Sequence, residues 1–227
     1  MDDVRQHRLK VEVLARAIAQ MGFGTEVITL GCHLGAPDVV RAVATCDVLF
    51  GCMDSVDGRH LLNRLATFYL QPYFDVGIKI EADGEGGIQQ VCGTVHYLQP
   101  GRSSLLSRGT YTMEQVRAAG LRRTDPAAYA EHLQSKYIVG VQEDRPAVIS
   151  VNMQIASMAV NEFLARLHPY RDDANRHFAT SRFSLSQAQC YTECDGESCP
   201  VLAPHVGRGD TRLLLDMPEL SELEPNP

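Results

Sequence analysis

Asp54 stands where an acidic side chain could bind a metal ion. It comes just after the apolar run from Val48 to Cys52, which is typical of a strand covered on both faces. Side chains at the carboxyl ends of parallel strands point into the ligand crevice of an open α/β sheet, and a carboxylate there can hold Mg²⁺ against nucleotide phosphates. Asp54 or Asp57 could equally cap the helix that follows.

Three further polar residues could take part in the same chemistry. Lys10 opens a predicted helix, where its simplest interpretation is a solvated surface charge. Arg59 lies one turn into the helix that begins next to Asp54, and a guanidinium there could face a phosphate. Asn63, one turn later, could extend the same polar face.

The elements that must position these residues alternate between helix and strand. Apolar residues three and four apart predict helices at 11–21, 37–43 and 61–68. Short apolar runs predict strands at 26–30, 48–52, 73–80 and 88–98, the last two joined by a glycine-rich turn at 83–87. This alternation indicates an α/β layer fold with parallel strands.

The second half of the chain is less regular. Residues 102–145 are polar, with a short helix predicted near 126–136, and loops of this length are often functional or mobile. Residues 148–151 predict a short strand or a lead-in to the helix that carries Ile155 and Leu167. Polar, glycine and proline residues over 168–227 predict an irregular appendage with a disordered acidic end at 221–227.

Bulk composition narrows the class of protein. The net charge of -7 gives no reason to expect nucleic-acid binding, and no apolar stretch is long enough to span a bilayer. The first residues are acidic and then helical, which argues against a signal peptide. An odd number of cysteines, 7, indicates reduced thiols in a cytoplasmic protein rather than a disulfide framework.

The segment around Asp54 resembles a known family signature. The run from Cys46 to Asp54, followed by Arg59 and Asn63, resembles the pattern D-V-[apolar]-x-x-x-D … R … L-N of the ThiF family. The strand at 72–78 resembles that family's P-x-[apolar]-D-x-G strand, and Lys10 matches the family lysine that contacts the nucleotide. Residues 146–152 and the helix after them match the element that follows the family's crossover loop.

The resemblance implies a fold class and a division of the chain. The fold is expected to be α/β, a Rossmann-like ThiF-type mixed sheet with helices on both faces, incomplete at its N-terminus and followed by an irregular C-terminal appendage. Residues 1–168 would form a partial ThiF-type adenylylating domain, with a crossover loop at about 102–145. Residues 169–227 would form the irregular C-terminal extension.

The resemblance also implies a reaction. ThiF-family enzymes adenylylate the C-terminal carboxylate of a ubiquitin-like or sulfur-carrier protein with ATP and Mg²⁺. Because two anions must meet, the site needs a metal and fixed positive charge. Asp54 would hold Mg²⁺ and Lys10 would contact the phosphates, with Arg59 and Asn63 in supporting roles. Family members are homodimers, so a dimer through the helix at 150–167 is expected.

The sequence departs from the family at its start. Family members begin with a strand, a G-x-G-x-x-G loop and a second strand, and none of these precedes Lys10 here. The predicted strands at 26–30 and 48–52 would then have unpaired edges. We expect a truncated reading frame, a separate polypeptide supplying the missing half, or a non-catalytic remnant. Truncation fits best because Lys10 and Asp54 are both present, and the chain alone would then be inactive.

The alternatives to an enzyme are a scaffold and a split enzyme. A non-catalytic binding protein would dock a ubiquitin-like partner through the strands at 73–98 and the crossover loop. One half of a split enzyme would need a second chain to complete its site.

Serine and cysteine positions bear on two other family features. Ser104 and Ser107 stand at the spacing of a zinc-binding C-x-x-C pair, and since serine is a poor zinc ligand, no structural zinc is expected. Cys190, Cys194 and Cys199 are more simply interpreted as surface-loop thiols than as a metal site. The crossover loop contains no cysteine, so a thioester nucleophile would have to be one of these three C-terminal cysteines.

Overall fold

The computed structural model describes residues 2–83, 85, 87–134, 148–218 and 220. Its centre is a five-stranded sheet in the order β1-β2-β3-β4-β5. The strands are β1 (Leu49–Gly51), β2 (Tyr73–Ala82), β3 (Ile88–Leu98), β4 (Thr180–Ser184) and β5 (Gln189–Glu193). β1 runs parallel to β2, and every later pair is antiparallel. The mixed α/β sheet confirms the predicted fold class.

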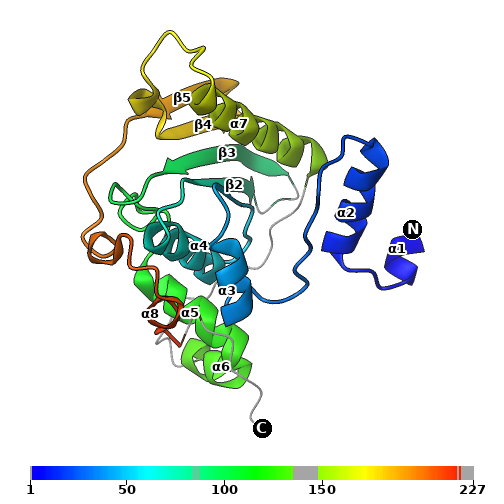
Figure 1. Ribbon diagram of the computed structural model, residues 1–227, viewed down its shortest axis with the longest axis vertical. Coiled ribbons are helices and arrows are strands. Elements are labelled where there is room, and N and C mark those ends of the chain that lie inside the picture. Colours follow the sequence, from blue (N-terminus) through cyan, green and yellow to red (C-terminus); the bar gives the residue numbers. More distant parts are fainter. Residues whose placement is uncertain (1, 84, 86, 135–147, 219, 221–227) are drawn as a thin grey trace.

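Helices lie on both faces of this sheet (Figure 1), with α4 on one side and α7 on the other. The α-helices are α1 (Asp2–Arg5), α2 (Lys10–Met21), α3 (Pro37–Val43), α4 (Val56–Phe68), α5 (Met113–Thr124), α6 (Pro126–Gln134), α7 (Ile149–Leu167) and α8 (Thr211–Leu214). The described residues also form the short 3-10 helices η1 (Asn175–Phe178) and η2 (Ala203–His205). Of the described helices, none combines the length and the apolar character that crossing a bilayer requires.

The larger apolar core lies under α4. Leu61, Leu65 and Phe68 are almost fully buried there, against Tyr73 of β2 and Leu98 of β3. The three helix residues recur at spacings of three and four, which places them on one face. This packing holds α4 on the sheet next to the end of β1.

A smaller apolar core lies under α7. Ile155 and Ala159, one turn apart, pack with Val95 of β3 and Phe183 of β4. Gly93 of β3 permits this close approach, since a Cβ there would lie 2.1 Å from Cε1 of Phe183. The core under α4 thus covers one face of the sheet from β1 to β3, and the core under α7 covers the other face as far as β4.

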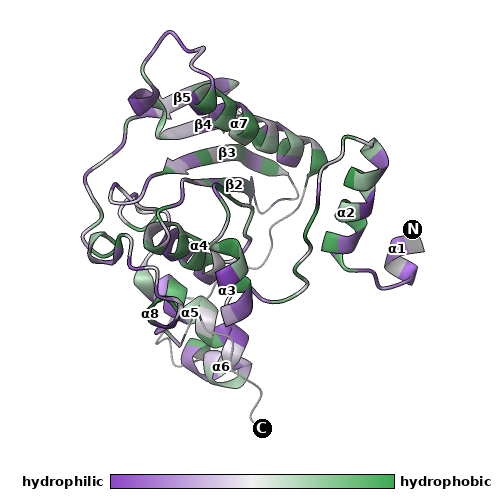
Figure 2. Cartoon of the chain, in the orientation of Figure 1, coloured by the Kyte–Doolittle hydropathy of each residue, from purple (hydrophilic) through white to green (hydrophobic). Residues whose placement is uncertain are grey.

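The N-terminal helix α2 differs from both α4 and α7. It is amphipathic but contains no buried residue, and it stands apart from the sheet in Figure 1. Figure 2 shows apolar residues along it, of which Leu14 is 62% exposed. Gly22 ends the helix in the left-handed conformation at φ 72°, which glycine adopts at little steric cost.

The predicted strand at 26–30 is wrong. The segment has no regular secondary structure, and Ile28 is 79% exposed. A strand needs a partner for its backbone N–H and C=O groups, and among the described residues β1 pairs with β2 alone. An apolar run without a neighbouring edge therefore does not become a strand. The strands predicted at 73–80 and 88–98 are confirmed.

Three predictions for the second half of the chain need correction. Residues 169–227 are not irregular throughout, because β4 and β5 extend the sheet there. Of the two alternatives predicted for 148–151, the strand is wrong and the lead-in to the helix is confirmed, since Val148 caps α7 and residues 149–151 begin it. The loop at 102–145 contains α5 as well as the predicted α6, while 135–145 and the acidic end at 221–227 lie outside the described residues.

These elements were missed for identifiable reasons. β4 buries Phe183 as its one large apolar side chain, and every residue of β5 is exposed, so neither strand shows the apolar alternation that signals a strand. Helix α5 did have a signal, since Thr112 and Gln115 form a capping box at its start.

Candidate nucleotide site

The loop that carries Asp54 joins β1 to α4. β1 buries Leu49 and Gly51, and Asp54 follows on an exposed part of the chain. The cap of α4 is Ser55, whose Oγ accepts a hydrogen bond from the Gly58 N–H at 3.2 Å. Neither Asp54 nor Asp57 is therefore the N-cap, so that interpretation of the two aspartates is wrong.

Asp57 has a structural role in the first turn of α4. It is only 5% exposed, and its Oδ2 lies 3.3 Å from Nε of Arg123 on α5. This ion pair ties α4 to the helix that follows β3. Of the two aspartates, Asp54 alone is left at the surface beside the end of β1.

Arg59 holds the backbone of the β1–α4 loop at Met53, the residue before Asp54. Its Nε donates to the Met53 carbonyl at 3.1 Å, and Nη2 donates to the Val76 carbonyl of β2 at 2.9 Å. Nη1 pairs with Oδ2 of Asp75 at 2.6 Å. One guanidinium therefore joins the β1–α4 loop to the neighbouring strand, which fixes the backbone that leads directly into Asp54.

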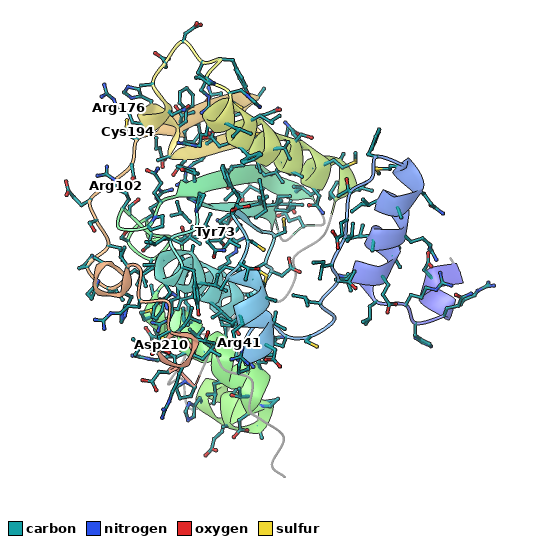
Figure 3. All side chains as sticks on the ribbon, viewed as in Figure 1. Arg41, Tyr73, Arg102, Arg176, Cys194 and Asp210 are labelled. Carbon is teal, nitrogen blue, oxygen red and sulfur yellow. The ribbon has the colours of Figure 1, made fainter. Side chains whose placement is uncertain are left out.

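Asp75 is the functional-site residue that the sequence analysis missed. Its side chain is 0% exposed, and its Oδ1 accepts a hydrogen bond from the Tyr73 hydroxyl at 2.8 Å. Figure 3 shows Tyr73 in the interior of the molecule. Burial raises the pKa of Asp75 to about 6, although Arg59 and Tyr73 act in the opposite direction. An aspartate inside the apolar strand at 73–80 was the available signal.

Asn63 lies one turn beyond Arg59 but faces a different part of the protein. It is 3% exposed, and its Oδ1 accepts a hydrogen bond from the Leu105 N–H at 2.8 Å. The side chain therefore anchors the loop after β3 to α4. Arg59 and Asn63 share a helix but not the common polar face that their spacing suggested.

Lys10 is the first residue of α2 and is exposed. Packing on the sheet fixes Arg59 and Asn63 relative to the Asp54 loop. Since α2 buries no residue, no comparable packing fixes Lys10. The structure thus brings Asp54 and Arg59 together at the β1–α4 junction, turns Asn63 towards the loop after β3, and leaves Lys10 on a separate element.

The donor set fits a magnesium ion bound with a nucleotide. Asp54 presents hard carboxylate oxygens at the carboxyl end of a parallel strand. Within the part of the chain that the structure describes, no group of three or more His, Cys, Asp or Glu residues could hold a metal. Asp54 would therefore supply one ligand and the phosphates and water the others, which is the usual way Mg²⁺ binds at nucleotide sites.

Hydrogen bonds and an ion pair made by polar side chains stabilise the loop that follows β3. Ser104 and Ser107 hydrogen-bond to each other's backbone N–H, at 3.1 Å and 2.9 Å. Arg108 donates to the Tyr97 and Ala179 carbonyls and pairs with Asp195 at 3.0 Å. Burial would raise the pKa of Asp195, but its hydrogen bonds and the Arg108 charge lower it. The loop is thereby joined to the segment after β5.

The three C-terminal cysteines lie in different environments. Cys190 is on β5 and exposed, Cys194 follows β5 and is exposed, and Cys199 is buried. The Cys199 N–H donates to the Arg102 carbonyl at 3.1 Å. Only two of the three are thus surface thiols, because Cys199 packs beneath the loop that follows β3.

Comparison with known proteins identifies the class of the chain. The model of the ThiF family matches residues 2–201, so the chain belongs to the ThiF family, as the Asp54 segment suggested. A search of curated proteins finds no match.

Among solved structures, the fold is similar to that of E. coli MccB, determined with AMPCPP and selenomethionyl MccA. The TM-score is 0.55 at 12% identity, over 85% of this chain and 49% of that one. The chain thus spans about half the length of the MccB chain, and at this identity the likeness is one of fold.

Proposed function

We propose that this chain takes part in ATP-dependent adenylylation of a carboxylate-bearing substrate. The observation that carries the proposal is the Arg59 brace, which joins Met53 to Val76 and Asp75 and so holds the Asp54 loop at the carboxyl end of β1, against β2. A rigid loop is what a metal-binding carboxylate needs, because catalysis by fixed charges requires that they be in place before the reaction.

Each candidate residue has a role in this proposal. Asp54 binds Mg²⁺, and Lys10 contacts the nucleotide phosphates when α2 is docked. Arg59 acts through the Met53 carbonyl as a positioning residue, and Asn63 supports the site by holding the loop after β3. Bound Mg²⁺ would polarise the phosphoryl oxygens of ATP, which makes the α-phosphorus more open to attack by the substrate carboxylate as pyrophosphate leaves.

The substrate that we propose is the C-terminal carboxylate of a ubiquitin-like or sulfur-carrier protein. Support comes from membership of the ThiF family and from the fold of MccB, which was determined with AMPCPP and MccA. Of β2, only Tyr73, Phe74 and Asp75 pair with β1, so the strand continues beyond β1 to Ala82. A carrier protein would approach this side of the sheet, where Asp54 is exposed.

We also propose a homodimer through α7. Its outer face leaves Ile149, Met153 and Leu167 exposed by 76%, 64% and 58%, an apolar row that a second copy would cover. Sedimentation equilibrium tests this. The Met153→Asp variant should be monomeric, and an unchanged dimer would exclude this face. A chain that supplies further strands beside β1 remains the alternative partner, because β1 pairs on one side only among the described residues.

Calorimetry with ATP tests the nucleotide site directly. Titration of the dimeric protein with ATP should show binding that depends on magnesium, and Asp54→Ala should weaken it about tenfold or more. Asp38→Ala is the matched control, because Asp38 is an exposed aspartate of α3 whose partner is Arg41. Equal ATP binding by Asp54→Ala and wild type would remove Asp54 from the site.

Pyrophosphate exchange tests the reaction. With ATP and a ubiquitin-like protein that has a free C-terminal glycine, an active enzyme exchanges labelled pyrophosphate into ATP. ATP binding without exchange for any carrier would favour a non-catalytic binding protein. Restored exchange after a second polypeptide is added would identify one half of a split enzyme.

A further inference from the structure

A thiol and an imidazole meet at the far edge of the sheet from β1. Cys194 comes directly after β5, and His177 is on η1, before β4. Sγ of Cys194 lies 3.3 Å from Nδ1 of His177; the thiol is exposed and the imidazole is half-buried. The Ala179 N–H donates to the Glu193 carbonyl at 3.0 Å, so the backbones on either side of the pair are joined. In Figure 3, Cys194 and Arg176 lie together at this edge.

A third residue determines the direction of this hydrogen bond. Nε of Arg176 donates to Nε2 of His177 at 3.4 Å. A neutral imidazole has one N–H and one acceptor nitrogen, so an accepting Nε2 places the proton on Nδ1. Nδ1–H then donates to the sulfur of Cys194. The contact thus places an N–H donor directly against the sulfur atom that would react.

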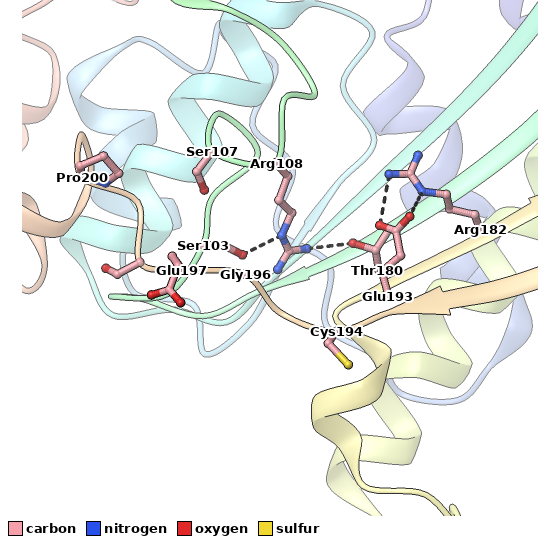
Figure 4. A pocket seen from close by; sticks show the side chains of 11 residues that line it. Ser103, Ser107, Arg108, Thr180, Arg182, Glu193, Cys194, Gly196, Glu197 and Pro200 are labelled. Carbon is pink, nitrogen blue, oxygen red and sulfur yellow. Dashed lines mark hydrogen bonds and ion pairs between the residues drawn. The ribbon is translucent and has the colours of Figure 1, made fainter.

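The thiol opens onto a cavity with charges of both signs. The cavity has a volume of about 340 Å³, and Cys194 is one of the residues that line it. The lining also includes the cations Arg108 and Arg182 and the anions Glu193 and Glu197 (Figure 4). Arg182 and Glu193 pair at 3.1 Å and are both partly exposed. Such a lining fits a small molecule that carries both ammonium and carboxylate groups.

We propose that Cys194 is a modification site that forms a mixed disulfide with a small zwitterionic disulfide of the glutathione type. Sγ of Cys194 attacks one sulfur of the disulfide, a new S–S bond forms, and the original S–S bond breaks. The second sulfur leaves as a thiolate and takes up the proton that Cys194 gives up. Cys194 is oxidised and half of the small disulfide is reduced, so the step needs no further oxidant.

The chain contains its own control for this proposal. Cys190 is also exposed and lies four residues earlier on β5. It lines a different cavity, together with Tyr191 and Thr192. The cavity at Cys190 also carries charge, from Glu162, Arg171 and Arg182. The two thiols therefore share solvent access and a charged cavity, so a difference in their rates isolates the effect of His177.

The test measures both thiols in one reaction. The full chain is incubated at pH 7 with glutathione disulfide, and mixed disulfides at Cys194 and Cys190 are counted by peptide mass mapping over time. We expect Cys194 to react about tenfold faster, the factor that one hydrogen bond to a charged group gives. His177→Gln should remove that advantage and leave the Cys190 rate unchanged. Equal rates at the two wild-type thiols, or an unaltered Cys194 rate in His177→Gln, overturn the proposal.

A second disulfide tests the contribution of the cavity. Bis(2-hydroxyethyl) disulfide is small and uncharged, so it depends on the thiol alone. Arg182→Gln should slow the reaction of Cys194 with glutathione disulfide several-fold more than its reaction with the uncharged reagent. Equal slowing of both reagents would show that the cavity charges do not select the ligand, and would overturn the zwitterionic part of the proposal. Unchanged thermal unfolding confirms that each variant is folded.

Discussion

The β1–α4 junction and the N-terminal helix α2 each carry part of the proposed nucleotide site, but they are held in different ways. At the junction, Arg59 and Asp75 join loop and strand through a buried ion pair, and α4 packs on the apolar core. In α2 no residue is buried, and Lys10 is at its exposed first turn. The difference teaches that a matching residue type becomes part of a site only when packing fixes its position.

Of the changes considered for these two regions, removing Arg59 from the β1–α4 junction should lower the free energy of unfolding most. Arg59→Ala leaves the fully buried Asp75 without its cation, and an unpaired buried charge costs about 3–5 kcal/mol of the free energy of unfolding. Urea unfolding at pH 7 measures the loss. Arg41→Ala, at an exposed ion pair on α3, should cost less than about 1 kcal/mol. Similar losses in the two variants would show that the brace does not stabilise the junction.

The second largest effect is expected from acid, which should lower the free energy of unfolding through two buried histidines. Burial first, and nearby arginines second, lower the pKa of His60 to about 4 and that of His96 to about 3. Both imidazoles are neutral when folded and protonate below pH 6.5 when unfolded. Stability is therefore full above pH 6.5 and falls as the pH drops towards 4, by up to about 3 kcal/mol for each.

Asp75 acts in the opposite sense over part of that range. Its pKa is raised to about 6, so the folded state binds the proton more tightly and gains stability from pH 6 down to about 4. Urea unfolding from pH 7 to pH 4 should still show a net loss, because two histidines oppose one aspartate. His60→Gln should flatten the curve. An equally steep curve for that variant would place the acid sensitivity elsewhere.

The smallest effect is expected on α2. Leu14 is 62% exposed, so Leu14→Ala should change the free energy of unfolding by less than about 0.5 kcal/mol. Leu61→Ala, at the same residue type buried under α4, should cost about 2–5 kcal/mol. Denaturation of the two variants side by side measures the contrast. A large loss of unfolding free energy in Leu14→Ala would mean that α2 packs on the rest of the protein in solution. Lys10 would then have a fixed position as well.

Much of the fold near the junction could be predicted from local pattern. Apolar periodicity predicted the strands at 73–80 and 88–98 and the helix that carries Leu61 and Leu65. In each case the apolar side chains recur on the face that is buried in the core. The site could be predicted only in part. Residue order pointed to Asp54 and Arg59, but not to Asp75 as the partner of Arg59, because that contact joins positions 16 residues apart on different elements.

The sequence by itself determined the family, the α/β class and Asp54 as the metal candidate, because these depend on residue order and periodicity. Tertiary structure alone decided that Arg59 braces the Met53 carbonyl, that Asn63 holds Leu105 and that Cys194 meets His177. It also decided that 26–30 is not a strand while 180–184 is. The physical reason is the same in each case: a backbone edge or a buried charge is stable only with a partner, and the partner's place is set by the whole fold.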